Sequence, residues 1–306
     1  MRAHIVVLGS ANTDLTVKAD RLPRPGETVT GGEFMVSYGG KGANQALAAL
    51  KVGATVHLLA KIGTDAYGNL LYEHLIRSGL PPEGLVRDPE APAGVALIAI
   101  DREGNNQIIV APGSNWRFSV QDLQALTLFP AGTSLLLTQL EIPLPTVEQG
   151  LRLARAQGIT TILNPAPATP LPSSIYPLVD ILTPNEREAG DLAGMEVTGL
   201  EEAERAAAVL QSRGCRQVIV TLGAQGALLY SGGRGEHFPA FPVQAIDTVA
   251  AGDAFNGALA AALAMHRPLS EAIRFANAAG ALSTTQRGAQ ESLPAREAIE
   301  QLMTRA

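Results

Sequence analysis

The chain has 306 residues, and its composition, 46% hydrophobic but only 4% aromatic, predicts a large core filled mainly by aliphatic side chains. The net charge of −6, without any basic run, excludes an extended nucleic-acid-binding surface. The single cysteine, Cys215, excludes an internal disulfide, and no apolar stretch is long enough to span a membrane. A reducing, cytoplasmic location is therefore expected.

Short apolar runs alternate with helical patterns along most of the chain. Buried strands are predicted at residues 5–8, 55–60, 134–138, 160–163, 180–183 and 217–221. Helical periodicity falls at 41–52, 66–78, 146–157, 185–193 and 201–213, and in the last third at 252–265, 269–284 and 294–303. This alternation is typical of βαβ units, so it predicts a three-layer α/β/α fold with a mostly parallel central sheet and helices on both faces.

Two stretches, at about 14–38 and 93–111, interrupt this alternation. Apolar and polar residues alternate there without a following helix, and turn sequences such as Pro23-Arg24-Pro25-Gly26 separate the strands. They predict antiparallel hairpins that form a small β-sheet, lying as a lid over a substrate site of a single domain. The outer faces of these strands need a partner, which makes a homodimer contact through the lid an expectation.

The run 247–257 is the strongest candidate for catalysis. Ala250, Ala251 and Gly252 open an alanine-rich helix, where small side chains leave backbone N–H groups accessible to an anion. The helix dipole adds a partial positive charge there. Asp253, in the first turn, is placed to accept the proton of an attacking hydroxyl group. The alternative is that Asp253 only caps the helix.

The glycine-rich run 38–45, Tyr-Gly-Gly-Lys-Gly-Ala-Asn-Gln, matches no nucleotide-binding fingerprint. Gly42 stands where a phosphate loop needs Ser or Thr, and Gln45 stands where a dinucleotide-binding loop needs its third glycine. What remains is a turn that brings backbone close to a ligand, with Lys41 and Asn44 as polar donors. An ordinary glycine-rich turn before a helix is the alternative.

Three further polar runs follow predicted strands, where ligands of parallel sheets bind. Asn12 and Asp14 are placed to hydrogen-bond a sugar, although alone they form only a polar turn. Asn185 and Glu188 lie one helical turn apart and could hold hydrated Mg²⁺, but a helix cap explains them as well. The run 221–226, Thr-Leu-Gly-Ala-Gln-Gly, could cradle a nucleotide or form a hairpin.

The order of these motifs resembles the ribokinase (PfkB) family of carbohydrate kinases along essentially the whole chain. Asn-Pro-Ala-Pro at 164–167, Pro-Gly-Glu-Thr-Val at 25–29, Gly-Val-Ala-Leu-Ile at 94–98 and Gly-Ala-Gln at 288–290 add to the resemblance. It implies ATP-dependent phosphorylation of D-ribose at the 5-hydroxyl. The alternatives are a kinase for 2-deoxyribose, fructose or a nucleoside, and a non-catalytic sugar or nucleotide sensor on the same fold.

The resemblance also implies roles, position by position. Asp253 matches the catalytic base, and residues 250–252 match the anion hole for the transferring phosphoryl group. The sugar-binding positions are Asn12, Asp14, Gly40, Lys41, Gly42, Asn44, Glu141 and Asp253. The nucleotide-binding positions are Asn185, Thr221, Leu222, Gly223, Ala224, Gln225, Gly226, Gly252 and Asn277. Glu188 matches an acidic residue linked indirectly to Mg²⁺, and an activating K⁺ is matched by Asp247, Val249, Ser283, Gln286, Gly288 and Ser292.

Overall fold

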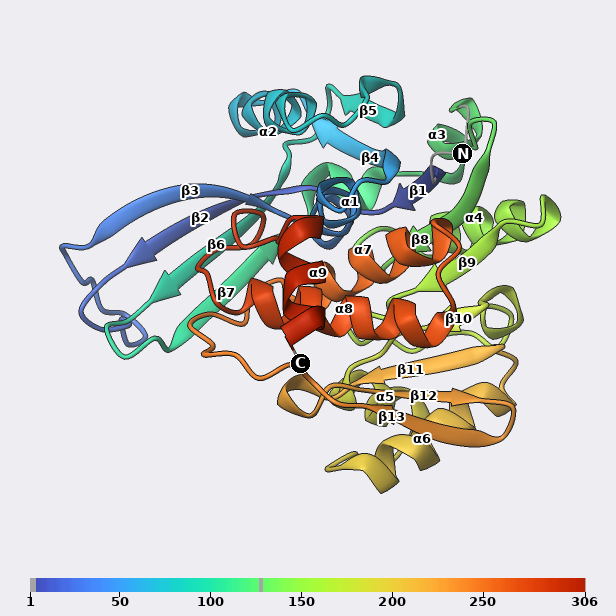
Figure 1. The fold of residues 1–306 in the computed structure, drawn as a ribbon. Helices are drawn as coiled ribbons and strands as arrows, with labels where there is room; N and C mark the ends of the chain where they lie inside the picture. The colour runs from blue at the N-terminus through green and yellow to red at the C-terminus, as the bar shows by residue number, and fades with distance from the viewer. Residues whose placement is uncertain (1–3, 127–128, 306) are drawn as a thin grey trace.

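The computed structural model describes residues 4–126 and 129–305, which form two β-sheets with helices around the larger one (Figure 1). Within these residues the main sheet has nine strands in the order β13-β12-β11-β10-β9-β8-β1-β4-β5. The strands from β11 to β5 run parallel, and the edge strands β12 and β13 are antiparallel. The predicted α/β fold with a mostly parallel sheet is confirmed.

The strands of the main sheet are β1 (His4–Leu8), β4 (Thr55–Gly63), β5 (Leu85–Asp88), β8 (Thr133–Thr138), β9 (Thr160–Leu163), β10 (Ile181–Leu182), β11 (Gln217–Thr221), β12 (Ala227–Ser231) and β13 (Arg234–Phe238). The helices are α1 (Lys41–Lys51), α2 (Ala66–Arg77), α3 (Val120–Ala125), α4 (Leu144–Ala156), α5 (Glu186–Ala193), α6 (Leu200–Ser212), α7 (Ala251–Ala264), α8 (Leu269–Ser283) and α9 (Arg296–Arg305). Short 3₁₀ turns, η1 (Pro82–Gly84), η2 (Gly113–Arg117), η3 (Tyr176–Leu178) and η4 (Gly223–Gln225), lie in the connections.

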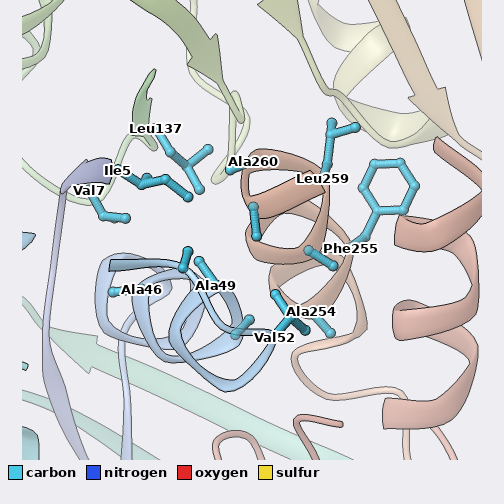
Figure 2. Packing of buried hydrophobic residues seen from close by; sticks show 14 of the residues in the cluster. Ile5, Val7, Ala46, Ala49, Val52, Leu137, Ala254, Phe255, Leu259 and Ala260 are labelled. Carbon is cyan, nitrogen blue, oxygen red and sulfur yellow. The ribbon is translucent and has the colours of Figure 1, made fainter. Parts of the chain in front are cut away.

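Successive side chains of each strand point to opposite faces of the main sheet, so the core has two layers, one on each face. From β1, Ile5 and Val7 pack with α1, α2, α7, α8 and α9, whereas Val6 and Leu8 pack with α3 to α6. Figure 2 shows the first layer, where β1 lies against helices α1 and α7. The helices on both faces that the sequence predicts are therefore present.

Small side chains let α1 and α7 approach closely enough to define the site. At Gly257 of α7, a Cβ atom would lie 2.5 Å from the carbonyl oxygen of Gln45 in α1. Residues four apart share a helix face, so this contact turns Asp253, one turn earlier, toward α1 as well. A run of alanines in both helices, seen in Figure 2, extends the same close packing away from the site.

The second sheet, which is the predicted lid, projects from one end of the molecule (Figure 1). Its strands are β2 (Asn12–Lys18), β3 (Glu33–Gly39), β6 (Gly94–Ile100) and β7 (Asn106–Ala111), in the order β3-β2-β6-β7. The two hairpins are antiparallel as predicted, but the central pair, β2 and β6, is parallel. The first strand of each hairpin, β2 or β6, follows a strand of the main sheet, β1 or β5. Both β2 and β6 therefore run away from the main sheet, in the same direction.

Across residues 4–126 and 129–305, the helices all fall short of the length and apolar character needed to cross a bilayer. Cys215 is buried, and burial raises the pKa of its thiol to about 12, so the sulfur stays protonated at neutral pH.

Candidate active site

The Asp253 carboxylate is held by two amide side chains of helix α1. Its Oδ2 accepts a hydrogen bond from Nδ2 of Asn44 at 2.9 Å, and its Oδ1 accepts one from Nε2 of Gln45 at 2.9 Å. Asp253 is buried, and the N-cap position of α7 belongs to Ala250, which makes no side-chain cap. The capping alternative for Asp253 is therefore excluded, and its carboxylate is oriented by neighbours distant in the sequence.

Further buried amide side chains hold Asn44 and Gln45 in place. Nε2 of Gln45 also donates to Oδ1 of Asn164 at 3.0 Å, and Oε1 of Gln45 accepts from Nε2 of Gln139 at 2.6 Å. Oδ1 of Asn44 accepts from Nε2 of Gln290 at 3.1 Å. The sequence did not identify Gln45, Gln139 or Gln290 as site residues. The available clue was the Gly-Lys-Gly-Ala-Asn-Gln run itself, whose last residue makes the contact.

Two adjoining cavities meet at the start of α7. The larger, of about 460 Å³, is lined by apolar groups from 240–245 and α8 together with Asn277. The smaller, of about 220 Å³, contains Asp253, Lys41 and Glu188. Asn185, Thr221, Thr248, Ala251 and Gly252 line both. A ligand spanning the two cavities would thus pass the N-terminus of α7 and reach Asp253.

Most predicted nucleotide-binding residues lie at the larger cavity. The residues brought together there are Asn185, Thr221, Gly223, Ala224, Gly226, Gly252 and Asn277. Leu222 and Gln225 do not line it: Leu222 is buried against the core beneath the turn. The run 221–226 also connects β11 and β12 as a hairpin. It can therefore be both a hairpin turn and part of a nucleotide site.

The first turn of α7 offers backbone N–H groups to the junction of the cavities. Ala250 has a left-handed backbone, with φ of 60°. The N–H of Ala251 already donates to the carbonyl of Thr248 at 3.3 Å, whereas that of Gly252 has no partner within the described residues. The space beside Gly252 is open, since a Cβ placed there would meet no atom within 4 Å. This arrangement suits an anion held by backbone groups.

Lys41 supplies the positive charge of the smaller cavity. Asp253 is the largest cause of its raised pKa, with Glu141 and Glu188 adding to the effect and burial opposing it. The ammonium group therefore remains charged. Burial raises the pKa of Glu188, and the attraction of Lys41 works against that rise. A cation between carboxylates is well placed to balance an incoming phosphate.

The predicted sugar-binding residues gather where β1, the lid and α1 meet. Oε2 of Glu141 accepts from Oγ of Ser10 at 2.5 Å and from the backbone N–H of Lys41 at 2.9 Å. Gly42 packs so tightly on the backbone after β1 that a Cβ would lie 2.5 Å from the nitrogen of Ser10. Asp14 lies on β2, where any side chain at Gly39 would overlap its carboxylate.

Asp14 should make the stability of the protein depend on pH. Burial, then the charges of Glu141 and Glu291, raise the pKa of Asp14 from 3.8 to about 7. Because the folded state holds this proton more tightly than the unfolded state, its contribution to stability is lost as pH rises from about 4 through about 7. Asp14→Asn should therefore increase the free energy of unfolding at about pH 8 by up to about 4 kcal/mol, and much less near pH 4.

Urea unfolding at both pH values measures this difference, with the exposed lid residue Asp20 changed to Asn as the matched control. A gain for Asp14→Asn that is the same at both pH values would contradict the burial of an ionisable carboxyl group at this position.

Gly40 joins the lid strand β3 to helix α1 by a backbone that only glycine adopts easily. Its φ is 86°, and a Cβ would lie 2.8 Å from the backbone nitrogen of Asn12. Gly26, with φ of 80°, stands in open space. Gly26→Ala should cost about 1–3 kcal/mol of stability from conformation alone. Gly40→Ala should lower the stability clearly more, because the new Cβ also pushes against the backbone of Asn12. Equal losses in denaturant unfolding would mean that this contact is not tight.

Asn185 and Glu188 form a capping box at the start of α5. Oδ1 of Asn185 accepts from the N–H of Glu188 at 2.8 Å, and Oε2 of Glu188 accepts from the N–H of Asn185 at 2.9 Å. The helix-cap interpretation is confirmed, and both residues also line the smaller cavity. Oε1 of Glu188 has no partner in the described part of the chain, so a carboxylate oxygen remains for a hydrated cation.

The residues predicted to bind a monovalent cation lie on the loop before α7, at Ser283 (the last residue of α8) and on the loop after α8. Asp247 joins the two loops. Its Oδ1 accepts from the N–H of Val249 at 3.0 Å, and its Oδ2 accepts from the N–H of Gly288 at 3.1 Å. The backbone N–H of Asp247 donates to the carbonyl of Thr284 at 3.1 Å. A carboxylate oxygen is a hard donor, so Asp247 offers a ligand type that fits an alkali cation.

Known proteins match this chain along nearly its whole length. A family model described as pfkB family carbohydrate kinase matches residues 2–296. The ribokinase of Haemophilus influenzae is 40% identical and the deoxyribokinase of Salmonella typhi 34% identical, covering 97% and 98% of this chain and the same shares of their own. The structure of Arabidopsis thaliana ribokinase complexed with ribose and ATP is similar with a TM-score of 0.91, at 33% identity over 99% of each chain. The chain belongs to the PfkB family of carbohydrate kinases.

Proposed function

We propose that this protein is a ribokinase, which transfers the γ-phosphoryl group of ATP to the 5-hydroxyl of D-ribose. The observation that carries the proposal is the position of Asp253: a buried carboxylate, held by Asn44 and Gln45, beside the open N-terminus of α7. The similarity to a ribokinase whose structure contains ribose and ATP supports this choice of substrates.

In this mechanism ATP occupies the larger cavity, and its phosphates reach the smaller one past Gly252. Asp253 accepts the proton of the sugar's primary hydroxyl as that oxygen attacks the γ-phosphorus, and ADP leaves on the opposite side. The backbone N–H groups at the start of α7 and the ammonium of Lys41 stabilise the charge on the transferring group. Closure of the lid excludes water, which limits hydrolysis of ATP.

Two cations belong to this proposal. Mg²⁺ would be held by ATP phosphates and waters near Glu188 and Asn185, and it supplies charge neutralisation. K⁺ would be held by the two joined loops and the end of α8, at Asp247, Val249, Ser283, Gln286, Gly288 and Ser292, and it would supply a fixed positive charge behind the anion-binding turn. The chain itself contributes the two hydrogen bonds that Asp247 accepts from these loops. They hold the turn before α7 in place.

A sugar panel tests the substrate assignment. ADP formation should be fastest with ribose, when 2-deoxyribose, fructose and adenosine are compared at equal concentrations, with and without K⁺. In this proposal Asp14 pairs a sugar hydroxyl, and a site built to pair a hydroxyl strongly rejects the analogue that lacks it. A preference for 2-deoxyribose would move the protein to a different member of the same family, and binding without turnover would make it a sensor.

We also propose that the protein is a cytoplasmic enzyme that forms a homodimer through the lid. Large apolar side chains are exposed on all four lid strands, among them Phe34 on β3 and Ile109 on β7, with 61% and 69% of their surface exposed. A contiguous apolar face of this kind usually has a partner. Light scattering should give twice the monomer mass, and Ile109→Asp should give the monomer. A monomeric wild type would remove the proposal.

A further inference from the structure

Asn115, on the turn η2 that follows the lid, has its amide fixed by backbone on both sides. It is buried, its Oδ1 accepts from the N–H of Ala11 at 3.0 Å, and its Nδ2 donates to the carbonyl of Ala11 at 3.2 Å. A backbone N–H can only donate and a carbonyl can only accept, so these contacts decide which end of the amide is which.

This fixed amide determines the orientation of Asn12. Nδ2 of Asn115 also donates to Oδ1 of Asn12 at 2.7 Å. The oxygen of Asn12 must therefore face Asn115, and the NH₂ group of Asn12 must face the other way. That NH₂ group has no hydrogen-bond partner in residues 4–126 and 129–305, and Asn12 starts β2 at the root of the lid.

The pair is anchored to the main sheet and leaves no spare room. A side chain at Gly94, which stands opposite Asn12 at the start of β6, would overlap both amides. The turn η2 is tied to β4, because Oγ of Ser114 donates to the carbonyl of Lys61 at 2.9 Å. The orientation of Asn12 is thus set from the rigid part of the molecule, whatever the lid strands do beyond it.

We propose that Asn115 is a positioning residue for sugar recognition, holding Asn12 so that its NH₂ group donates to a hydroxyl oxygen of the sugar. This inference rests on the proposed ribokinase function and deepens it. Asn12 can then only donate a hydrogen bond to the sugar. A bound sugar must therefore present an acceptor oxygen to the NH₂ group of Asn12. Asn115 itself does not touch the sugar.

The kinetic test compares Asn115→Leu with Ser114→Ala. Asn115→Leu keeps the branching and the number of side-chain heavy atoms but frees Asn12 to flip, and it should raise the KM for ribose about tenfold or more. The KM for ATP and kcat should stay within about threefold, since neither depends on Asn12. Ser114→Ala loosens the same turn without touching Asn12 and should leave the KM for ribose unchanged. An equal rise in both variants would mean that η2 acts only as general support.

A double-mutant cycle shows whether Asn115 acts through Asn12. In an Asn12→Ala background, Asn115→Leu should change the KM for ribose by no more than about twofold. If Asn115→Leu raised the KM for ribose by the same factor in both backgrounds, the proposal would be overturned.

Side-chain NMR of the ligand-free wild type tests the orientation even if ribose proves not to be the substrate or Asn115→Leu does not fold. The NH₂ signals of Asn12, identified by their loss in Asn12→Ala, should exchange rapidly with water, and those of Asn115 slowly. The opposite order would contradict the proposed orientation. Absence of any sugar-dependent turnover in the wild type, with the predicted exchange order, would instead remove the ribokinase function alone.

Discussion

Asp253→Asn should lower kcat for ribose-dependent ADP formation by at least about a hundredfold, because the variant cannot accept the proton of the attacking hydroxyl. The replacement keeps the size of the side chain. It also places an NH₂ group against one of the two amide donors, Asn44 or Gln45, which should cost about 1–3 kcal/mol of stability. Steady-state kinetics and denaturant unfolding measure the two effects separately.

Ribose binding provides the control for that variant. Calorimetry should show that Asp253→Asn still binds ribose, because Asp14, Glu141 and the Lys41 backbone remain in place. Retention of most of the wild-type kcat would show that another group accepts the proton. Loss of ribose binding together with kcat would show that the variant damaged the site, and Asp253→Ala would then be needed to separate the two roles.

Lys41→Met should also lower kcat strongly, by on the order of a hundredfold, because it removes the buried charge that balances the transferring phosphoryl group. The same change leaves Asp253, Glu141 and Glu188 without their shared cation, and the pKa of Glu188 should rise further. The fall in activity should be measured by single-turnover kinetics at saturating ATP and ribose, so that weakened binding does not mask the chemical step.

Lys61→Met is the matched control for the loss of a lysine. Lys61 is on β4 and pairs with Asp122 at 2.9 Å, outside both cavities. Its replacement should affect stability and leave kcat nearly unchanged. A similar fall in kcat for both variants would mean that Lys41 acts through the fold rather than through its charge.

The layout of the fold could be predicted because its elements carry local patterns. Parallel strands buried on both faces are continuous apolar runs, and the helices between them show amphipathic periodicity. The edge hairpin of β12 and β13 was missed, although the pair Gly232-Gly233 between two strands is a hairpin signature. β5 was missed because a four-residue strand leaves little pattern to find.

The site was only partly predictable, because its geometry depends on contacts between distant residues. The motifs identified Asp253 and Asn44, but Gln45 lies 208 residues from Asp253 in the sequence and meets it only because α1 and α7 pack through small side chains. Asn115 and Asn12 are 103 residues apart, and neither position shows this pairing by its own pattern. These amide contacts are consequences of packing, which periodicity alone does not encode.

The identity of the product decides whether this protein phosphorylates ribose at the 5-hydroxyl. Wild-type protein incubated with ATP, Mg²⁺, K⁺ and ¹³C-labelled ribose should convert the sugar to ribose 5-phosphate, with one ADP formed for each phosphomonoester seen by ³¹P and ¹³C NMR. ADP release without a sugar phosphate, phosphorylation at another carbon, or ribose bound but unchanged would each contradict the assignment of Asp253 as the base for the 5-hydroxyl.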